Sequence, residues 1–264
     1  MIAGRAADVV AKLGERAVVH DLYDDSGSHI YHALASADRF EVRELLRVVR
    51  PLDGSILDLA AGSGRLTLPL LALGRSVTAL ELSPAMLRLL AAELERLSAA
   101  RRERCRIVEG DMSRFELGER YGAVVLGTSS ISLLDEAGRA GLYACVAEHL
   151  QPGGRFAVST VGLAEDEQDD DEDTEIESPV AGGIRIFEHW PRGAPARTVT
   201  IVSRELSDDG APVPVWTSTI GVLAPQLLSA EFDRAGFEIV RRLPVPSPFG
   251  GRHADVLFEL RVAS

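Results

Sequence analysis

The sequence predicts an α/β fold in which one doubly wound, mostly parallel sheet of seven strands is covered by helices on both faces. Three observations support this prediction. Short β-type runs alternate with longer helical segments over residues 51–161. These runs are almost continuously apolar, as expected for strands that are buried on both faces. The chain has 264 residues and 46% hydrophobic content, which is enough for a packed core of this size.

The expected strands share one signature, a short apolar run bounded by polar residues or glycine. They span residues 55–60, 76–82, 105–110, 121–127, 155–161, 238–243 and 254–262. The expected helices between them span residues 65–73, 83–100, 135–150 and 224–237. In the second of these helices we expect Ser83 to be the N-cap, because Pro84 follows it at the first turn.

Two regions fall outside this alternation. The N-terminal region is expected to be helical with a polar break at residues 23–29, and the later region contains β-like pieces at residues 183–190, 197–206 and 214–223. The sequence therefore predicts four parts with different roles. They are an N-terminal helical cap (1–50), a core sheet region (51–161), an antiparallel lid insert with an acidic loop (162–222) and a C-terminal completion of the sheet (223–264).

The net charge of −12 comes mostly from one segment. Residues 164–177 hold ten acids and no bases, and the rest of the chain has 28 basic and 30 acidic residues. Such a run predicts a solvated, disordered loop, or a segment that guides a basic substrate. The chain has no basic stripe typical of nucleic-acid binding, no membrane-length apolar run and only two cysteines. We expect a cytoplasmic protein without a metal site, nucleic-acid partner or membrane association, and the oligomeric state is not predicted.

The loop after the first strand, "LDLAAGSGRLT", is the first candidate site. Gly62 and Gly64 permit close approach of a ligand to the backbone. Thr67 stands where a dinucleotide fingerprint has its third glycine, and the loop lacks the lysine of a phosphate-binding loop. Asp58, at the carboxyl end of the strand, would repel a diphosphate and attract an ammonium group.

The next two strands also end in acids. Glu81 is placed to accept both hydroxyls of a ribose, Asp111 to accept a hydrogen bond from an adenine amino group, and Met112 to pack on the ring. A site that holds an ammonium group, a ribose and an adenine, with no phosphate, is the site expected for S-adenosylmethionine (SAM).

Five motifs carry a resemblance to a known family. In order and spacing, "LDLAAGSGRLT", "ALELSPAML", "VEGDM", "YGAVVLG" and "LQPGGRFAVS" resemble the motifs of class I SAM-dependent methyltransferases. The resemblance covers about residues 53–161 and implies a Rossmann-like fold, SAM as cofactor and S-adenosylhomocysteine (SAH) as product. Ala60 departs from the pattern, because a glycine is commonest at that position.

A narrower resemblance covers nearly the whole chain. The segments "GERAVVHDLYDD", "LDLAAGSGRLTLPLLALG", "VTALELS" and "GLYACVAEHLQPGG" resemble N-methyltransferases of actinobacterial peptide natural products. This resemblance implies (di)methylation of a primary amine, favouring the modified C-terminal amine of a daptide-type ribosomal peptide. The alternatives are the N-terminal amine of a glycopeptide antibiotic or a small-molecule amine.

The expected cofactor contacts lie at the strand ends and in the N-terminal region, which in such methyltransferases often closes over the cofactor. They are Tyr23, Asp58, Ala60, Gly62, Arg65, Glu81, Leu82, Met86, Asp111, Met112 and Thr128. The catalytic candidates are His189, Tyr31 and Ser129, and the substrate-binding candidates are Trp190 and Arg252. Trp190 offers a ring face to an amine, and a packing role is the equal alternative. A dedicated base is optional, because an apolar pocket beside a sulfonium itself disfavours the ammonium form of the acceptor.

Two other functions remain as alternatives. One is a catalytically silent SAM-binding module, which would have no need for intact acids at Asp58, Glu81 and Asp111. The other is a nicotinamide-dependent oxidoreductase, which Thr67 and the "EGDM" motif disfavour.

Overall fold

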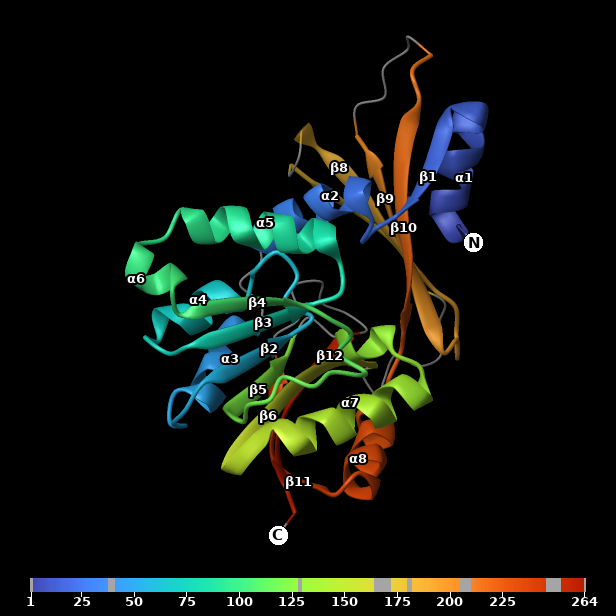
Figure 1. Cartoon of the computed structure of the whole chain (residues 1–264). Helices are drawn as coiled ribbons and strands as arrows, with labels where there is room; N and C mark the ends of the chain where they lie inside the picture. Colours follow the sequence, from blue (N-terminus) through green and yellow to red (C-terminus); the bar gives the residue numbers. More distant parts are fainter. Residues whose placement is uncertain are drawn as a thin grey trace. The chain divides into compact units, whose positions relative to one another are not determined.

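A computed structural model describes residues 2–37, 41–127, 130–163, 172–179, 182–204, 210–245 and 253–263. The chain divides into two compact units, each of which is built from two separate stretches of sequence. The first unit comprises Met1–Asp38 and Glu165–Val222, and the second comprises Arg39–Ala164 and Leu223–Ser264. Figure 1 shows both units and labels their helices and strands where there is room.

Within the described residues, the second unit holds a seven-stranded sheet in the order β11-β12-β6-β5-β2-β3-β4. Its strands are β2 (Ile56–Leu59), β3 (Val77–Glu81), β4 (Cys105–Glu109), β5 (Tyr121–Leu126), β6 (Leu150–Leu163), β11 (Phe237–Val245) and β12 (His253–Val262). The pairs among β6, β5, β2, β3 and β4 are parallel, and β12 pairs antiparallel with both β6 and β11. The predicted mostly parallel, seven-stranded Rossmann-like sheet is therefore confirmed.

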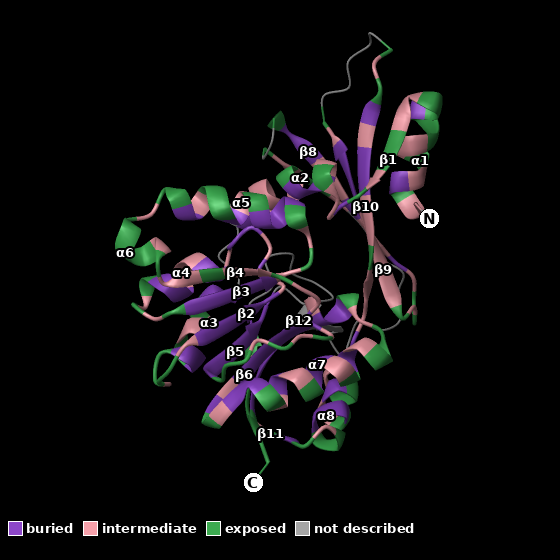
Figure 2. Cartoon of the chain, in the orientation of Figure 1, coloured by how far each residue is buried: buried purple, intermediate pink, exposed green. Residues whose placement is uncertain are grey.

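Helices cover both faces of this sheet, and each face has its own apolar core. One face packs against α3 (Val42–Val49), α4 (Thr67–Ala72) and α5 (Pro84–Glu95). The other packs against α7 (Glu136–His149) and α8 (Pro225–Arg234). Figure 2 shows the central strands as buried along most of their length. Two short helices lie in the connections between these elements. They are α6 (Ala99–Arg102), between α5 and β4, and η2 (Ser130–Leu133), between β5 and α7.

The strand order places a topological switch point beside β2. From β2 the chain builds outward through β3 and β4, and it then returns to the other side of β2 to build β5 and β6. Open α/β sheets bind ligands beyond the carboxyl ends of their strands at such a point. The fold therefore predicts a ligand site at the carboxyl ends of β2, β3, β4 and β5.

The first unit holds a five-stranded sheet within its described residues, in the order β1-β10-β9-β8-β7. Its strands are β1 (Ala17–Asp21), β7 (Glu172–Ser178), β8 (Ile184–Trp190), β9 (Ala196–Ser203) and β10 (Val213–Gly221). The helices of this unit are α1 (Gly4–Leu13), η1 (Gly14–Arg16) and α2 (Asp25–Ala37). The antiparallel strands β8, β9 and β10 confirm the three β-like pieces expected from the sequence.

Three local expectations were wrong. The N-terminal region is not purely helical, because Ala17–Asp21 forms a strand parallel to β10. The polar break does not interrupt the helices for its whole length, since α2 begins at Asp25. The acidic run is not entirely a loop, because Glu172–Ser178 pairs with β8 and Arg185 forms an ion pair with Glu175. The other positions of the acidic run, 164–171, lie outside the described residues.

The helix expected at residues 83–100 begins as predicted and ends early. Ser83 is the N-cap of α5, and its hydroxyl oxygen accepts a hydrogen bond from the Met86 N–H at 3.4 Å. The helix ends at Glu95, and the separate turn α6 starts at Ala99.

Candidate functional site

The loop between β2 and α4 is held in an unusual backbone conformation. Ala60, Gly62 and Gly64 all have positive φ, at 50°, 55° and 101°. Glycine adopts this region freely, whereas an alanine there is strained. This explains why a glycine is the commoner residue at position 60. At Gly64 an ideal Cβ would lie 2.7 Å from Leu90 Cδ1, so a side chain there would also require Leu90 to shift.

Asp58, which lies in β2 just before this loop, is a strongly perturbed acid. Its residue is 1% exposed, and one carboxylate oxygen accepts a hydrogen bond from the Thr67 hydroxyl at 2.6 Å. The other oxygen is buried and has no hydrogen-bond partner among the described residues. Burial raises the pKa of this carboxyl to about 7, against the lowering effects of the Thr67 hydrogen bond and the Arg65 charge. An orphaned buried carboxylate oxygen is a position where a cationic ligand group would be stabilised.

Glu81 ends β3 and is fixed by two backbone groups. The Gly62 N–H donates to one carboxylate oxygen at 2.9 Å, and the Ser83 N–H donates to the other at 2.8 Å. The Glu81 carboxylate therefore ties the glycine loop to the start of α5. Each oxygen keeps further acceptor capacity, so the geometry is compatible with the predicted ribose contacts.

The segment after β4 presents a second ordered acid. One carboxylate oxygen of Asp111 accepts hydrogen bonds from both the hydroxyl and the N–H of Ser113, at 2.7 and 2.8 Å. These bonds lower the pKa of Asp111. Met112 beside it is 8% exposed, whereas Leu82, after β3, is 64% exposed. An exposed leucine at the end of a buried strand offers an apolar surface of the kind that an adenine ring covers.

Arg65 has a partner that sequence reasoning missed. Its guanidinium forms an ion pair with Glu41, the N-cap residue of α3, and the side chains are 8% and 0% exposed. Glu41 lies 24 positions before Arg65 with no motif to single it out. Only the packing of α3 against the sheet brings the two together.

The residues of the second unit fit the predicted cofactor. The acids Asp58, Glu81 and Asp111 lie near or just beyond the carboxyl ends of three adjacent parallel strands, in the order in which an ammonium group, a ribose and an adenine would be met. The orphaned Asp58 oxygen and the exposed Leu82 side chain are the two features that a bound SAM would satisfy. Met86 is a weaker candidate, because its side chain is only 2% exposed within the packing of α5.

The remaining candidates are distributed differently. Tyr23 and Tyr31 lie in the first unit, where their rings form an edge-to-face pair at 5.3 Å and pack against its apolar cluster. His189 and Trp190 lie on β8 of the same unit. Trp190 is buried, and the Arg197 guanidinium lies 5.9 Å from its ring centroid, so it has a packing role of its own. The other candidates, Thr128, Ser129 and Arg252, lie outside the described residues.

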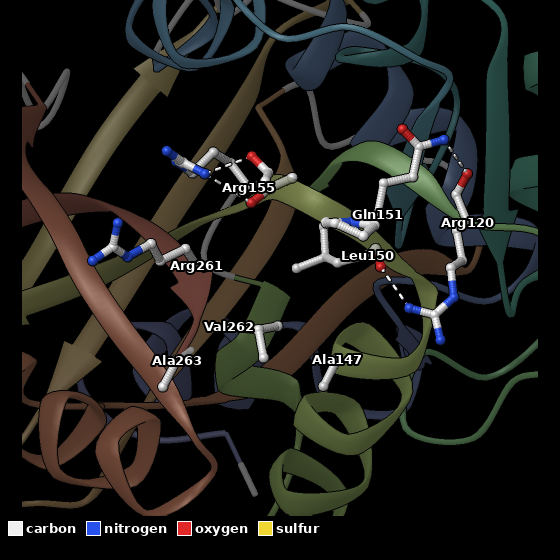
Figure 3. A pocket seen from close by; sticks show the side chains of 11 residues that line it. Arg120, Ala147, Leu150, Gln151, Arg155, Arg261, Val262 and Ala263 are labelled. Carbon is white, nitrogen blue, oxygen red and sulfur yellow. Dashed lines mark hydrogen bonds between the residues drawn. The ribbon is translucent and has the colours of Figure 1, made fainter.

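A cavity of about 440 Å³ in the second unit lies away from these acids (Figure 3). It is lined by Gln151–Gly154 at the start of β6, the end of β12 and the arginines Arg120, Arg155 and Arg261. Because Arg120 precedes β5 and Leu150 begins β6, the cavity sits at the amino ends of these parallel strands. We therefore do not place the active site there. Among the described residues, no cluster of metal-ligating side chains is found, and no helix is long and apolar enough to span a membrane.

Comparison with known proteins agrees with this geometry. The methyltransferase domain family matches residues 56–154. The chain belongs to the class I SAM-dependent methyltransferases and is an enzyme that uses SAM and releases SAH. No curated protein sequence gives a significant match.

Solved structures extend the similarity over the whole chain. The glycopeptide N-methyltransferase MtfA in complex with sinefungin is 35% identical, with 99% of this chain and 98% of that chain covered and a TM-score of 0.70. The same enzyme in complex with SAM gives 35% identity over the same shares, with a TM-score of 0.67. The CcbJ methyltransferase from Streptomyces caelestis is 21% identical, covers 92% of this chain and 100% of its own, and shares the fold at a TM-score of 0.72.

Proposed function

We propose that this methyltransferase transfers methyl groups to a primary amine of a peptide natural product. The observation that carries the proposal is the similarity to a glycopeptide N-methyltransferase at 35% identity over 99% of the chain. That similarity includes the first unit as well as the cofactor-binding core. A relationship limited to the core would support SAM binding and carry no information about the acceptor.

Methyl transfer requires few chemical groups from the protein itself. The bound cofactor supplies a methyl group on a sulfonium, and transfer is an in-line displacement in which positioning provides much of the rate. In this proposal Asp58, Glu81 and Asp111 hold the cofactor's ammonium, ribose and adenine. The acceptor amine must be neutral, and an apolar environment favours that form because it disfavours the charged ammonium.

The first unit is proposed to carry the groups that recognise the acceptor. Tyr31 and His189 belong to it. Uncharged hydroxyl and aromatic groups suit two successive methylations, because they do not demand a fixed number of N–H donors from the amine. A tight carboxylate clamp would favour the primary amine over its monomethylated product.

The acceptor peptide has two candidate classes. The sequence resemblance favours the modified C-terminal amine of a daptide-type ribosomal peptide over the N-terminal amine of a glycopeptide. The similarity to the glycopeptide N-methyltransferase MtfA favours a glycopeptide acceptor. Both are peptide-borne primary amines, so the same chemistry serves either. A small-molecule amine is the third possibility.

The test is incubation of the purified protein with SAM and two peptides of the same sequence. One peptide has a free N-terminus and a blocked C-terminus, and the other has an acetylated N-terminus and a C-terminal primary amine. Mass spectrometry of fragments should show a gain of two CH₂ units at one amine, and the site of the gain assigns the class. Methylation confined to oxygen or carbon acceptors would refute the proposal and leave the methyltransferase assignment intact.

A further inference from the structure

The segment that follows β4 lies along one face of α7. Three residues of α7, spaced four positions apart, contact it in turn, and they are Gly141, Cys145 and His149. Residues at this spacing share one face of a helix. We call these three residues the α7 stripe. We call residues 111–117 the adenine segment, because it begins with the two residues that are expected to contact adenine.

The first contact is a close approach of two backbones. An ideal Cβ at Gly141 would lie 2.4 Å from the carbonyl oxygen of Ser113, so an alanine there would displace the adenine segment. Glycine in the interior of a helix is less stable than alanine. The cost of Gly141 to α7 is therefore offset by the room that it leaves for the segment.

The other two contacts are hydrogen bonds from the segment to the helix. The Phe115 N–H donates to Cys145 Sγ at 3.5 Å, and the Leu117 N–H donates to His149 Nε2 at 3.0 Å. The contacts advance by two residues along the segment and by four along α7. Four helical residues rise about 6 Å, and two residues of extended chain cover a similar distance. The segment therefore stays in step with the stripe over its length.

His149 is held in one tautomer. Its Nδ1 lies 2.7 Å from the Cys145 carbonyl oxygen, which can only accept, so Nδ1 carries the ring proton. Nε2 is then the acceptor that the Leu117 N–H requires. His149 is 5% exposed, and its ring packs on the Phe115 ring with 4.7 Å between the centroids. The group that fixes the end of the adenine segment is thus itself fixed.

The stripe is connected to Asp111 through Ser113. The hydroxyl and the N–H of Ser113 both donate to one oxygen of the Asp111 carboxylate, and the carbonyl of Ser113 is the group that packs on Gly141. Because this oxygen is committed to Ser113, the second oxygen is the one proposed to meet the adenine amino group. A shift of the segment along or away from α7 would move that oxygen.

We propose that the α7 stripe sets the position of Asp111 for adenine, with His149 as a positioning residue that acts through Leu117. The inference rests on the adenine contact expected of Asp111, and it is independent of which acceptor the enzyme methylates. Loss of the stripe should weaken recognition of the adenine amino group more than binding of the rest of the cofactor. The reason is that Asp58 and Glu81 are held by hydrogen bonds of their own.

The experiment compares SAH with S-inosylhomocysteine, in which a carbonyl oxygen replaces the adenine amino group. Calorimetry with the full-length chain should show that SAH binds about tenfold more tightly, because a carboxylate accepts from an amino group and repels a carbonyl oxygen. His149→Leu keeps an apolar partner for the Phe115 ring and removes the acceptor, so this preference should fall to about twofold. His149→Gln should restore most of the preference, because its amide oxygen lies as many bonds from Cα as Nε2 does and can accept from the Leu117 N–H.

Two further variants separate positioning from general loss of structure. Gly141→Ala favours the helix itself, yet it should lower the preference as His149→Leu does, because the added Cβ displaces the segment. Asp135→Ala is the matched control at the other end of α7, where the Asp135 carboxylate caps the helix by accepting from the Gly138 N–H at 2.8 Å. It should lower the melting temperature and leave the preference unchanged.

Asp111→Asn distinguishes failure of the stripe from failure of the adenine contact. An amide N–H in place of the second carboxylate oxygen would donate to the inosine carbonyl, so the preference should move toward the inosine compound. An unchanged preference in Asp111→Asn would overturn the inference, because Asp111 would then not meet the base.

Three outcomes would overturn the role of the stripe while leaving the Asp111 contact intact. The first is an unchanged preference in His149→Leu, and the second is an equal loss of preference in the Asp135→Ala control. The third is a loss of preference in His149→Leu that His149→Gln does not restore. If His149→Leu fails to fold, Gly141→Ala decides the question, and an unchanged preference in that variant refutes the role of the stripe.

Discussion

Asp58→Asn should make the cofactor-free protein more stable and the cofactor complex weaker. The substitution keeps the shape of the side chain and an oxygen for the Thr67 hydroxyl, and it removes the buried charge. The pKa of Asp58 is raised from 3.8 to about 7, a difference of about three pH units. At 1.36 kcal/mol for each pH unit, ionising this carboxyl in the folded state costs up to about 4 kcal/mol.

The sign of the effect depends on pH. Between the unfolded pKa near 4 and the folded pKa of about 7, the folded state binds more protons than the unfolded state, so this group makes stability fall as pH rises. The asparagine variant lacks that slope. Its stability relative to wild type should therefore increase by about 2–3 kcal/mol between pH 5 and pH 8.

The assay is urea unfolding of both proteins at pH 5 and pH 8, together with calorimetric titration of SAH. The SAH affinity of the variant should fall by about 1–3 kcal/mol, because the ammonium group loses its acceptor. Wild type should bind SAH more weakly as pH falls below about 7, since Asp58 must lose a proton to hold the ammonium group. Asp53→Asn, at an exposed position before the same strand, is the control and should change neither quantity. A variant destabilised equally at both pH values would refute the reasoning.

Three further predictions follow from single features. Glu81→Ala should weaken SAH binding by about 1–3 kcal/mol and also lower stability, because the Gly62 and Ser83 N–H groups lose their acceptor; Glu95→Ala on the exposed side of α5 is its calorimetric control. Ala60→Gly should change the free energy of unfolding, measured in urea, by less than about 1 kcal/mol. Glycine relieves the strain of the positive φ at position 60, and this gain offsets the greater conformational entropy of glycine in the unfolded chain. A larger loss of stability would contradict the assignment of strain to Ala60. Replacing the aspartates at 169–171 by asparagine should leave the melting temperature unchanged and raise the KM for a cationic peptide only at low salt; an unchanged KM would argue against steering.

Several parts of the fold followed from local sequence patterns. The seven core strands are short apolar runs, and their alternation with helices predicts a parallel sheet without knowledge of any contact. The acids Asp58, Glu81 and Asp111 could be predicted as neighbours for the same reason. Each lies near or just beyond the carboxyl end of a strand, and the carboxyl ends of parallel strands meet at one edge of a sheet.

Other features were decided only by tertiary structure. Ala17–Asp21 is a strand because β10, nearly 200 residues later, supplies its hydrogen bonds, and acidic Glu172–Ser178 is a strand because β8 does the same. The left-handed conformation of Ala60 and the burial of Met86 depend on how the loop and α5 close against the sheet. None of these features can be predicted from the local periodicity of apolar residues in the sequence.

Glu41 shows the physical reason for this difference most clearly. A periodic pattern reports which face of an element is buried, but it carries no information on which distant side chain that face will meet. The Glu41–Arg65 pair exists because α3 packs on the sheet with its N-terminus beside the glycine loop, and because Gly127 leaves room for the carboxylate. The sequence by itself determined the sheet and the strand-end acids, whereas long-range packing decided the charge balance of the site they form.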